Sequence, residues 1–253
     1  MDLSIVLDGW PYDEADEARN IRKVVGVDGR MKLQIRLRNG VVQWEVEGRP
    51  DGVCPHGLPS ALDWCRQLMQ QGAFVLDDAL LKELEDELLD YDRRRQAFML
   101  VDDYPRAIAD AQHCLFILEL IRSCSEDADL VLRYDRLRPR IIADVARAGA
   151  FLDVQQGERL FACRCLTRGI RDIEQFFFDH EMHDQMPANR ERQMLIDLRR
   201  SLRERYGVPL TDTELLETLK AEQQVAIARE NYEMAARLRD KIGMLLDRLE
   251  RSG

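Results

Sequence analysis

Histidine and cysteine are the side chains of this 253-residue chain that could bind a metal or act as nucleophiles. His180 and His183 are three residues apart, whereas a zinc helix of the HExxH type spaces its histidines by four. Cys54 and His56 lie in a loop rich in glycine and proline, Gly48–Gly57, without the second cysteine pair typical of a zinc site. A metal or enzymatic site at either place is therefore the weakest of three functional hypotheses.

Other patterns of catalytic residues are missing from the sequence. It contains neither a G-x-S-x-G nucleophile elbow nor a G-x-x-x-x-G-K-[ST] phosphate loop. His113 and Cys114 fall on an otherwise apolar helical stretch, which predicts burial. Acidic residues stand beside Arg and Lys at helical spacing, and the basic clusters 93–95, 133–140 and 199–205 follow the same pattern. We therefore predict solvated helix faces, no enzyme and no cofactor.

Composition limits the class of protein. Charged residues make up 33% and hydrophobic residues 45% of the chain, which suits a packed globular core. The net charge of −10 argues against direct nucleic-acid binding, which needs a basic surface. No signal peptide and no apolar run of about 20 residues is seen, so no membrane span is expected. Six cysteines without a framework spacing predict buried, reduced thiols in a cytoplasmic protein.

The N-terminal part predicts a three-stranded antiparallel β-meander. Apolar and polar residues alternate over 32–38 and 41–47, and residues 21–27 are rich in β-branched side chains. Asp28-Gly29 and Asn39-Gly40 are hairpin-turn signals. We expect helices to cover the apolar face, because so small a sheet is not stable alone. The polar face is predicted to carry Lys32, Gln34, Arg36, Arg38, Gln43 and Glu45.

From Ser60 onward the sequence predicts helices. The expected segments are 60–71, 77–101, one opening at Tyr104-Pro105, one starting at Pro139, 160–178 and 189–206, with an acidic loop at 125–129 and Gly207 as a C-cap. Ala97 and Ala111 recur 51 residues later as Ala148 and Ala162, each in a similar context. This recurrence predicts either an irregular array of helical hairpins or an ordinary bundle.

The last forty residues predict two helices joined by a turn near Arg229 and Glu230. Thr211 and Glu214 have the spacing of a capping box, and Asn231 is a plausible N-cap for the second helix. A narrow apolar seam repeats at spacings of three and four, widened by Tyr232, Ala236 and Leu246. The seam consists of Ala235, Leu238, Ile242, Leu245 and Leu249.

This segment resembles the UVR motif, the helical hairpin of the B and C subunits of bacterial excision-repair nuclease and of some chaperone-protease regulators. The resemblance is carried by Leu219, Lys220, Glu222, Ala226, Glu230, Asn231, Tyr232, Glu233, Ala235, Ala236, Leu238, Arg239, Asp240 and Ile242. Tyr232 stands where phenylalanine is common in the family. The rest of the chain faintly resembles bacterial proteins that carry a UVR motif, with a tetratricopeptide-like helical character.

The resemblance implies a protein–protein interaction hairpin. The expected fold is mainly α, with the β-meander region over 1–57, a helical body over 58–208 and the UVR-like hairpin over 209–253. The leading hypothesis is a non-enzymatic adaptor whose hairpin docks on a partner or self-associates. The alternative is an accessory factor of DNA excision repair or of a chaperone-protease. The predicted interaction residues are Leu219, Tyr232, Ala235, Ala236, Leu238, Arg239, Asp240, Ile242 and Leu245.

Overall fold

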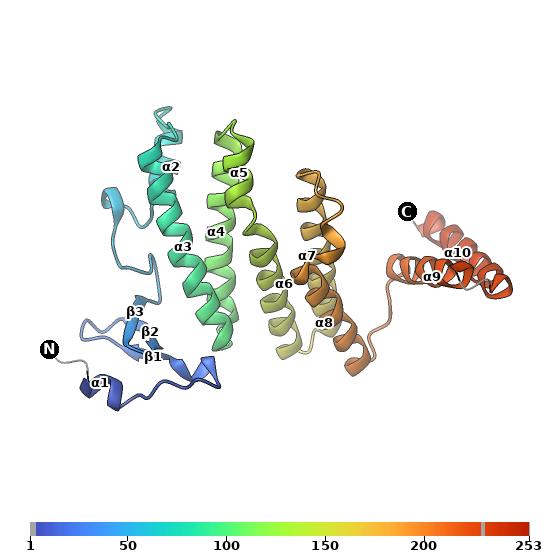
Figure 1. Ribbon diagram of the computed structural model, residues 1–253, viewed down its shortest axis with the longest axis horizontal. Coiled ribbons are helices and arrows are strands. Elements are labelled where there is room, and N and C mark those ends of the chain that lie inside the picture. Colours follow the sequence, from blue (N-terminus) through green and yellow to red (C-terminus); the bar gives the residue numbers. More distant parts are fainter. Residues whose placement is uncertain (1–3, 229–230, 253) are drawn as a thin grey trace. The chain divides into compact units, whose positions relative to one another are not determined.

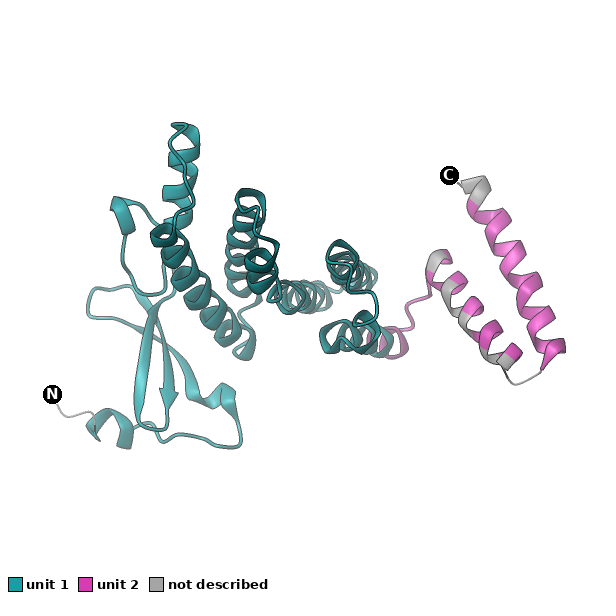
Figure 2. Cartoon of the chain, turned by 45° about the horizontal axis from the view of Figure 1, so that its top comes forward, with its two compact units in different colours: residues 1–201 teal, residues 202–253 magenta. Residues whose placement is uncertain are grey.

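The computed structural model describes residues 4–228 and 231–252 (Figure 1). The chain divides into two compact units, residues 1–201 and 202–253, coloured separately in Figure 2. The first unit holds a small sheet and an array of helices, and the second is dominated by two helices. The prediction of a mainly helical fold that begins with a three-stranded sheet is confirmed.

The sheet is the predicted antiparallel meander, in the order β1-β2-β3. Ile35 on the central strand lies opposite Ile21 on one side and Val42 on the other. Gly29, in the first turn, has a φ of 76°, a left-handed conformation that suits glycine. The strands are β1 (Ile21–Val25), β2 (Met31–Leu37) and β3 (Gly40–Glu45).

The apolar face of the sheet is covered by helices, as predicted. Leu33 is fully buried and Val46 nearly so. They pack in one cluster with Phe98, at the end of α3 (Asp78–Leu100), and with Ala107 near the start of α4 (Tyr104–Cys124). The meander is thereby fixed to one end of a helical hairpin.

The polar face is less exposed than the alternation predicted. Lys32 and Arg36 are both buried. The Nζ of Lys32 lies 2.7 Å from the Asp28 carboxylate and is also paired with Glu45. The Nε of Arg36 donates to the carbonyl of Trp10 at 2.7 Å, in the N-terminal arm that holds α1 (Ser4–Asp8) and the 3-10 turn η1 (Glu17–Asn20). Local partners therefore cover two cations that were expected to face solvent.

The helices of the first unit begin and end close to their predicted positions, and α2 and α3 begin directly after side chains that cap them. Ser60 accepts from the N–H of Asp63 at 3.0 Å, and Asp77 accepts from that of Leu80 at 2.8 Å. None of the helices in the described ranges is long and apolar enough to cross a membrane. Besides α3 and α4, the elements are η2 (Pro55–Gly57), α2 (Ala61–Gln70), α5 (Ala128–Asp135), α6 (Arg138–Gln155), α7 (Arg159–Asp179), η3 (Met186–Ala188) and α8 (Arg190–Tyr206).

The acidic segment 125–129, expected to be a loop, contains the start of a helix. The carboxylate of Asp127 accepts from the N–H groups of Asp129 and Leu130, and α5 follows. An acidic side chain at this position satisfies backbone donors of the first turn and interacts favourably with the helix dipole. The prediction of a loop is therefore confirmed for residues 125–127 and wrong for Ala128 and Asp129, which begin α5.

The helices form an array of hairpins in which each helix packs on its neighbour. α3 packs on α4, α4 on α6, and α6 on α7 (Figure 1). The alanines that recur 51 residues apart are buried in both hairpins. A Cβ added to Gly169 would lie 2.4 Å from the Cβ of Ala146, so α6 and α7 approach too closely for any other residue there. The two hairpins that the recurrence predicted are therefore present.

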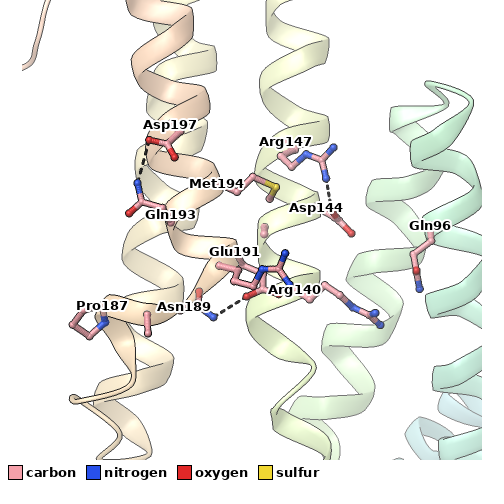
Figure 3. A pocket seen from close by; sticks show the side chains of 13 residues that line it. Gln96, Arg140, Asp144, Arg147, Pro187, Asn189, Glu191, Gln193, Met194 and Asp197 are labelled. Atoms are coloured by element: carbon pink, nitrogen blue, oxygen red, sulfur yellow. Dashed lines mark hydrogen bonds and ion pairs between the residues drawn. The ribbon is translucent and has the colours of Figure 1, made fainter.

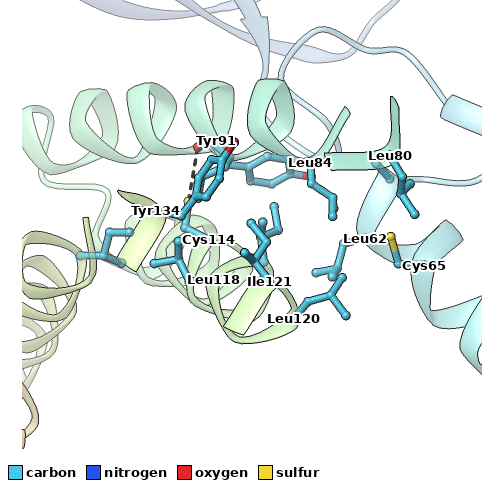
Figure 4. Close-up of a cluster of buried hydrophobic side chains, with 14 of the residues drawn as sticks. Leu62, Cys65, Leu80, Leu84, Tyr91, Cys114, Leu118, Leu120, Ile121 and Tyr134 are labelled. Atoms are coloured by element: carbon cyan, nitrogen blue, oxygen red, sulfur yellow. Dashed lines mark hydrogen bonds between the residues drawn. The ribbon is translucent and has the colours of Figure 1, made fainter. Parts of the chain in front are cut away.

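A large apolar cluster lies among α2, α3, α4, α5 and the start of α6 (Figure 4). Its fully buried members include Ala61, Cys65, Leu84, Ala111, Cys114, Ile117 and Ile141. Leucines of α3 thus meet small and branched residues of α4, as in other close-packed helical cores.

Two arginines of the cluster 93–95 are buried, contrary to the predicted solvated face. Arg95 is fully buried and pairs with Asp92 at 2.6 Å and with Asp144 of α6. Asp92 in turn pairs with Arg140 of α6. These ion pairs join the two hairpins, since α3 and α6 belong to different ones.

The neighbouring Arg94 makes a separate buried pair within the first hairpin. Its Nε and Nη2 donate to the two oxygens of Asp110 in α4, at 2.8 and 2.7 Å. Its Nη1 donates to the carbonyl of Glu45 in β3 at 2.7 Å. One guanidinium therefore links α3, α4 and the sheet.

Candidate functional site

Cys54 and His56 have different surroundings in the loop that was considered for metal binding. The Nε2 of His56 lies 2.9 Å from the Glu83 carboxylate, and its ring stacks on Trp64 with the centroids 4.8 Å apart. Cys54 is exposed. The imidazole therefore helps to attach the loop to α2 and α3.

His180 and His183 also have separate partners. α7 ends at Asp179, as predicted for a helix that finishes before these histidines. The Nε2 of His180 lies 2.8 Å from an Asp135 oxygen, whereas the ring of His183 contacts Phe178. Within the described residues, no group of three or more His, Cys, Asp or Glu side chains could hold a metal ion.

His113 and Cys114 lie at the interface of α3 and α4. Cys114 is fully buried, as predicted, and burial raises the pKa of its thiol. The ring of His113 stacks on Tyr91 at 3.8 Å, and its Nε2 lies 2.8 Å from the buried carboxylate of Glu87. The same carboxylate accepts from two N–H groups at the start of α2. These contacts give His113 and Glu87 a structural role.

The reactivity of the cysteine thiols tests which of them the fold buries. Cys54 and Cys124 are exposed, contrary to the expectation that all six cysteines are buried, whereas Cys65 and Cys114 are fully buried. Burial also raises the pKa of Cys65 to about 11, which keeps its thiol protonated and unreactive near neutral pH. We expect Ellman's reagent to modify Cys54 and Cys124 in the native protein and Cys65 and Cys114 only after unfolding. Peptide mapping would locate the labels, and equally fast labelling of Cys65 would contradict this assignment.

The second unit contains the predicted helical hairpin, α9 (Asp212–Ala228) and α10 (Tyr232–Ser252). The capping box is present: Thr211 N–H donates to Glu214 at 3.0 Å, and Glu214 N–H donates to the Thr211 hydroxyl at 3.4 Å. Asn231 caps α10 by accepting from Met234 N–H at 3.1 Å. The predicted turn at Arg229 and Glu230 lies outside the described residues.

The apolar seam is buried between the two helices of the hairpin from Ala235 to Leu245, whereas Leu249 is only half-buried. Leu215 and Leu216 of α9 pack against it from the edge. Five of the nine predicted interaction residues therefore hold α9 and α10 together. The buried set comprises Leu219, Ala226, Ala235, Leu238, Ile242 and Leu245.

A second stripe runs along α10 next to the seam. Tyr232, Ala236, Arg239, Gly243 and Leu246 follow one another at spacings of four, three, four and three, so they share one helix face. Tyr232 is 68% and Leu246 39% exposed, so neither widens the seam as predicted. A Cβ on Gly243 would meet no atom within 4 Å.

Exposure also distinguishes other residues of this hairpin. Ile227 of α9 is 44% exposed. Arg239 and Asp240 pair with each other at 3.0 Å, and both side chains are mostly exposed. The nine predicted residues thus divide into a buried set within the hairpin and a more accessible set, namely Tyr232, Ala236, Arg239 and Asp240.

Comparison with known proteins identifies this hairpin. The UvrB/uvrC motif, UVR, matches residues 213–247. Comparisons of the chain with curated proteins and with solved structures give no match. The matched range begins just inside α9 and ends within α10, and it includes the exposed stripe and the seam as far as Leu245. The second unit of this chain therefore carries a UVR motif, a helical hairpin of the kind that mediates protein–protein contacts.

Proposed function

We propose that the protein is a non-enzymatic adaptor that docks on a protein partner through its UVR hairpin. The observation that supports this most directly is the pair of adjacent stripes on α10. The seam stripe is used between α9 and α10, while the second stripe presents an accessible tyrosine and leucine. Two large apolar side chains on one helix face are suited to a partner surface.

The shape of the second stripe suits another helix. Ala236 and Gly243 lie between Tyr232 and Leu246 along the stripe. Their small side chains leave the backbone of α10 accessible at those two positions. Small residues allow a second helix to approach closely, and the large ones at either end can fill its grooves. Arg239, midway along the stripe, supplies a charged group that favours an acidic position on the partner.

The test is a pair of matched substitutions on α10. Tyr232→Glu combined with Leu246→Glu places two carboxylates on the stripe, whereas Met244→Glu changes a 72% exposed residue away from it. Burial of a large apolar side chain contributes about 1.5–3 kcal/mol, so we expect the double variant to weaken docking by about a hundredfold. The readouts are quantitative affinity capture and, for docking on a second copy, light scattering after size-exclusion chromatography.

Each outcome has a clear meaning. Proteins captured by the wild type and by Met244→Glu, but lost with the double variant, would support the stripe as the docking face. Unchanged capture and unchanged oligomeric state in a double variant that keeps its helicity would remove the proposal.

A second candidate function follows from the identity of the motif. The UvrB/uvrC match favours an accessory role in excision repair, in which the partner is a subunit of the excision nuclease. The measurement is titration of the full chain with purified B or C subunit by calorimetry. We expect binding that the Tyr232→Glu/Leu246→Glu variant abolishes, and the absence of heat with either subunit would exclude this role.

A further inference from the structure

The first unit contains an open groove beside α6 that the hairpin does not involve. Its larger hollow has a volume of about 710 Å³ and lies among the end of α3, the middle of α6 and the start of α8 (Figure 3). Gln96 borders it on the α3 side, and Met194 on the α8 side. Asn189, which caps α8 by accepting from Arg192 N–H at 2.8 Å, lies at its edge.

A smaller hollow of about 200 Å³ continues this groove toward the start of α6. The two hollows share Arg140, Asn189 and Glu191. The smaller one is bordered by Phe176, Phe177 and Met182 and also by polar side chains, including Arg136 and Gln185. We call the two together the α6–α8 groove; charged and apolar side chains border both of its hollows.

The acidic side chains in the groove already have cationic or amide partners. Asp144 pairs with Arg95 and, at 3.1 Å, with Arg147. Glu191 accepts from the amide of Asn189 at 2.8 Å. Asp197, at the α8 side, is paired with Arg200 at 3.3 Å and accepts from the Gln193 amide. None of these carboxylates needs a ligand cation for neutralisation.

Two of the four arginines that border the groove, in contrast, have no carboxylate partner among the described residues. Arg140 uses Nη2 for Asp92, but its buried Nε has no acceptor among the described residues. Arg136 and Arg190 form no ion pair within the described part of the chain. Four arginines and three carboxylates border the groove, although the whole chain has a net charge of −10. The groove is therefore a locally cationic place on an acidic protein.

We propose that the α6–α8 groove binds an acidic peptide segment. A glutamate or aspartate of the peptide pairs with Arg140 and Arg190, where the start of α8 adds a favourable dipole. A neighbouring apolar side chain of the peptide lies on Met182, which is half-buried at the edge of the smaller hollow. The groove is longer than a single carboxylate needs, and its own carboxylates disfavour a polyanion such as nucleic acid.

The test uses the full-length protein and a fluorescein-labelled peptide with two glutamates next to a leucine and a phenylalanine. The control peptide carries glutamines in place of the glutamates. Arg190→Ala removes an exposed guanidinium from the groove, and Arg171→Ala removes an exposed guanidinium of α7 that does not border it. We expect saturable anisotropy with the acidic peptide only. A charge-assisted pair is worth about 1.5–3 kcal/mol, so Arg190→Ala should weaken binding by at least about tenfold and Arg171→Ala should not.

Several outcomes would overturn the proposal. They are equal binding of the glutamine peptide, an unchanged affinity in Arg190→Ala, and no saturation up to about 1 mM peptide, the range of the weakest specific contacts. Inorganic phosphate or acetate that displaces the peptide at concentrations too low to act through ionic strength would assign the groove to a small anion instead. Since the UVR hairpin is not involved, none of these results bears on its docking.

Discussion

Replacing Asp110 with alanine is expected to lower the free energy of unfolding of the first unit by about 3–5 kcal/mol. Arg94 and Asp110 are both almost completely buried and form two parallel hydrogen bonds. Without the carboxylate, Arg94 keeps only its bond to the Glu45 carbonyl and remains charged in a nonpolar interior. Urea unfolding followed by circular dichroism measures the loss.

Two controls separate this effect from a general sensitivity of α3 and α4. Asp86→Ala removes a carboxylate of α3 that pairs with Lys82 at 3.0 Å on the surface, and should cost less than about 1 kcal/mol. The double variant Arg94→Met/Asp110→Leu removes both charges and should recover most of the stability, because a buried pair is often replaceable by apolar residues. A stability of Asp110→Ala within about 1 kcal/mol of the wild type would show that the pair is not buried in solution.

Leu238→Asp is expected to unfold the UVR hairpin while leaving the first unit folded. Leu238 lies at the centre of the seam, where a carboxylate would have no partner, and such a burial costs several kcal/mol. Two helices of this length have little stability beyond their shared seam. We expect a loss of helical signal at 222 nm and rapid proteolysis within residues 212–252.

The comparison for this variant is Lys241→Asp, on an exposed position of the same helix. This variant introduces the same side chain outside the seam. The helical signal of the hairpin and the pattern of proteolysis should therefore stay as in the wild type. If Leu238→Asp leaves the hairpin protected, the seam is not what holds α9 and α10 together. The result also matters for interpreting docking experiments, since a seam variant loses binding by unfolding and not by changing the docking face.

Much of the architecture could be predicted because its signals are local. Asn39-Gly40 and strict alternation predict a hairpin whichever way the chain packs afterwards. The side chains of Ser60 and Asp77 cap their helices by accepting hydrogen bonds from N–H groups only three residues further along the chain. Asp127 is an N-cap of the same kind, but the acidic residues around it led us to predict a loop where the short helix α5 begins.

The charged interior could not be predicted, because its partners are distant along the chain. Arg95 and Asp144 are 49 residues apart, and an arginine three residues after an aspartate looks the same on a surface as in a core. The α6–α8 groove has the same origin, since its residues come from α3, α6, α7, α8 and the segment between α7 and α8. On α10, both stripes are visible in the sequence, but the sequence does not show which one α9 covers.

The ion pairs between α3 and α6 imply an order of assembly. Contacts within each hairpin join residues that are close along the chain, so α3–α4 and α6–α7 can each close quickly. Arg95 and Asp144 come from different hairpins and lose their hydration only when the two hairpins meet. Both charges must lose their bound water before they can pair, and this cost is offset only when the two hairpins have nearly reached their final positions. We therefore expect two hairpins that form early and a charged joint between them that closes last.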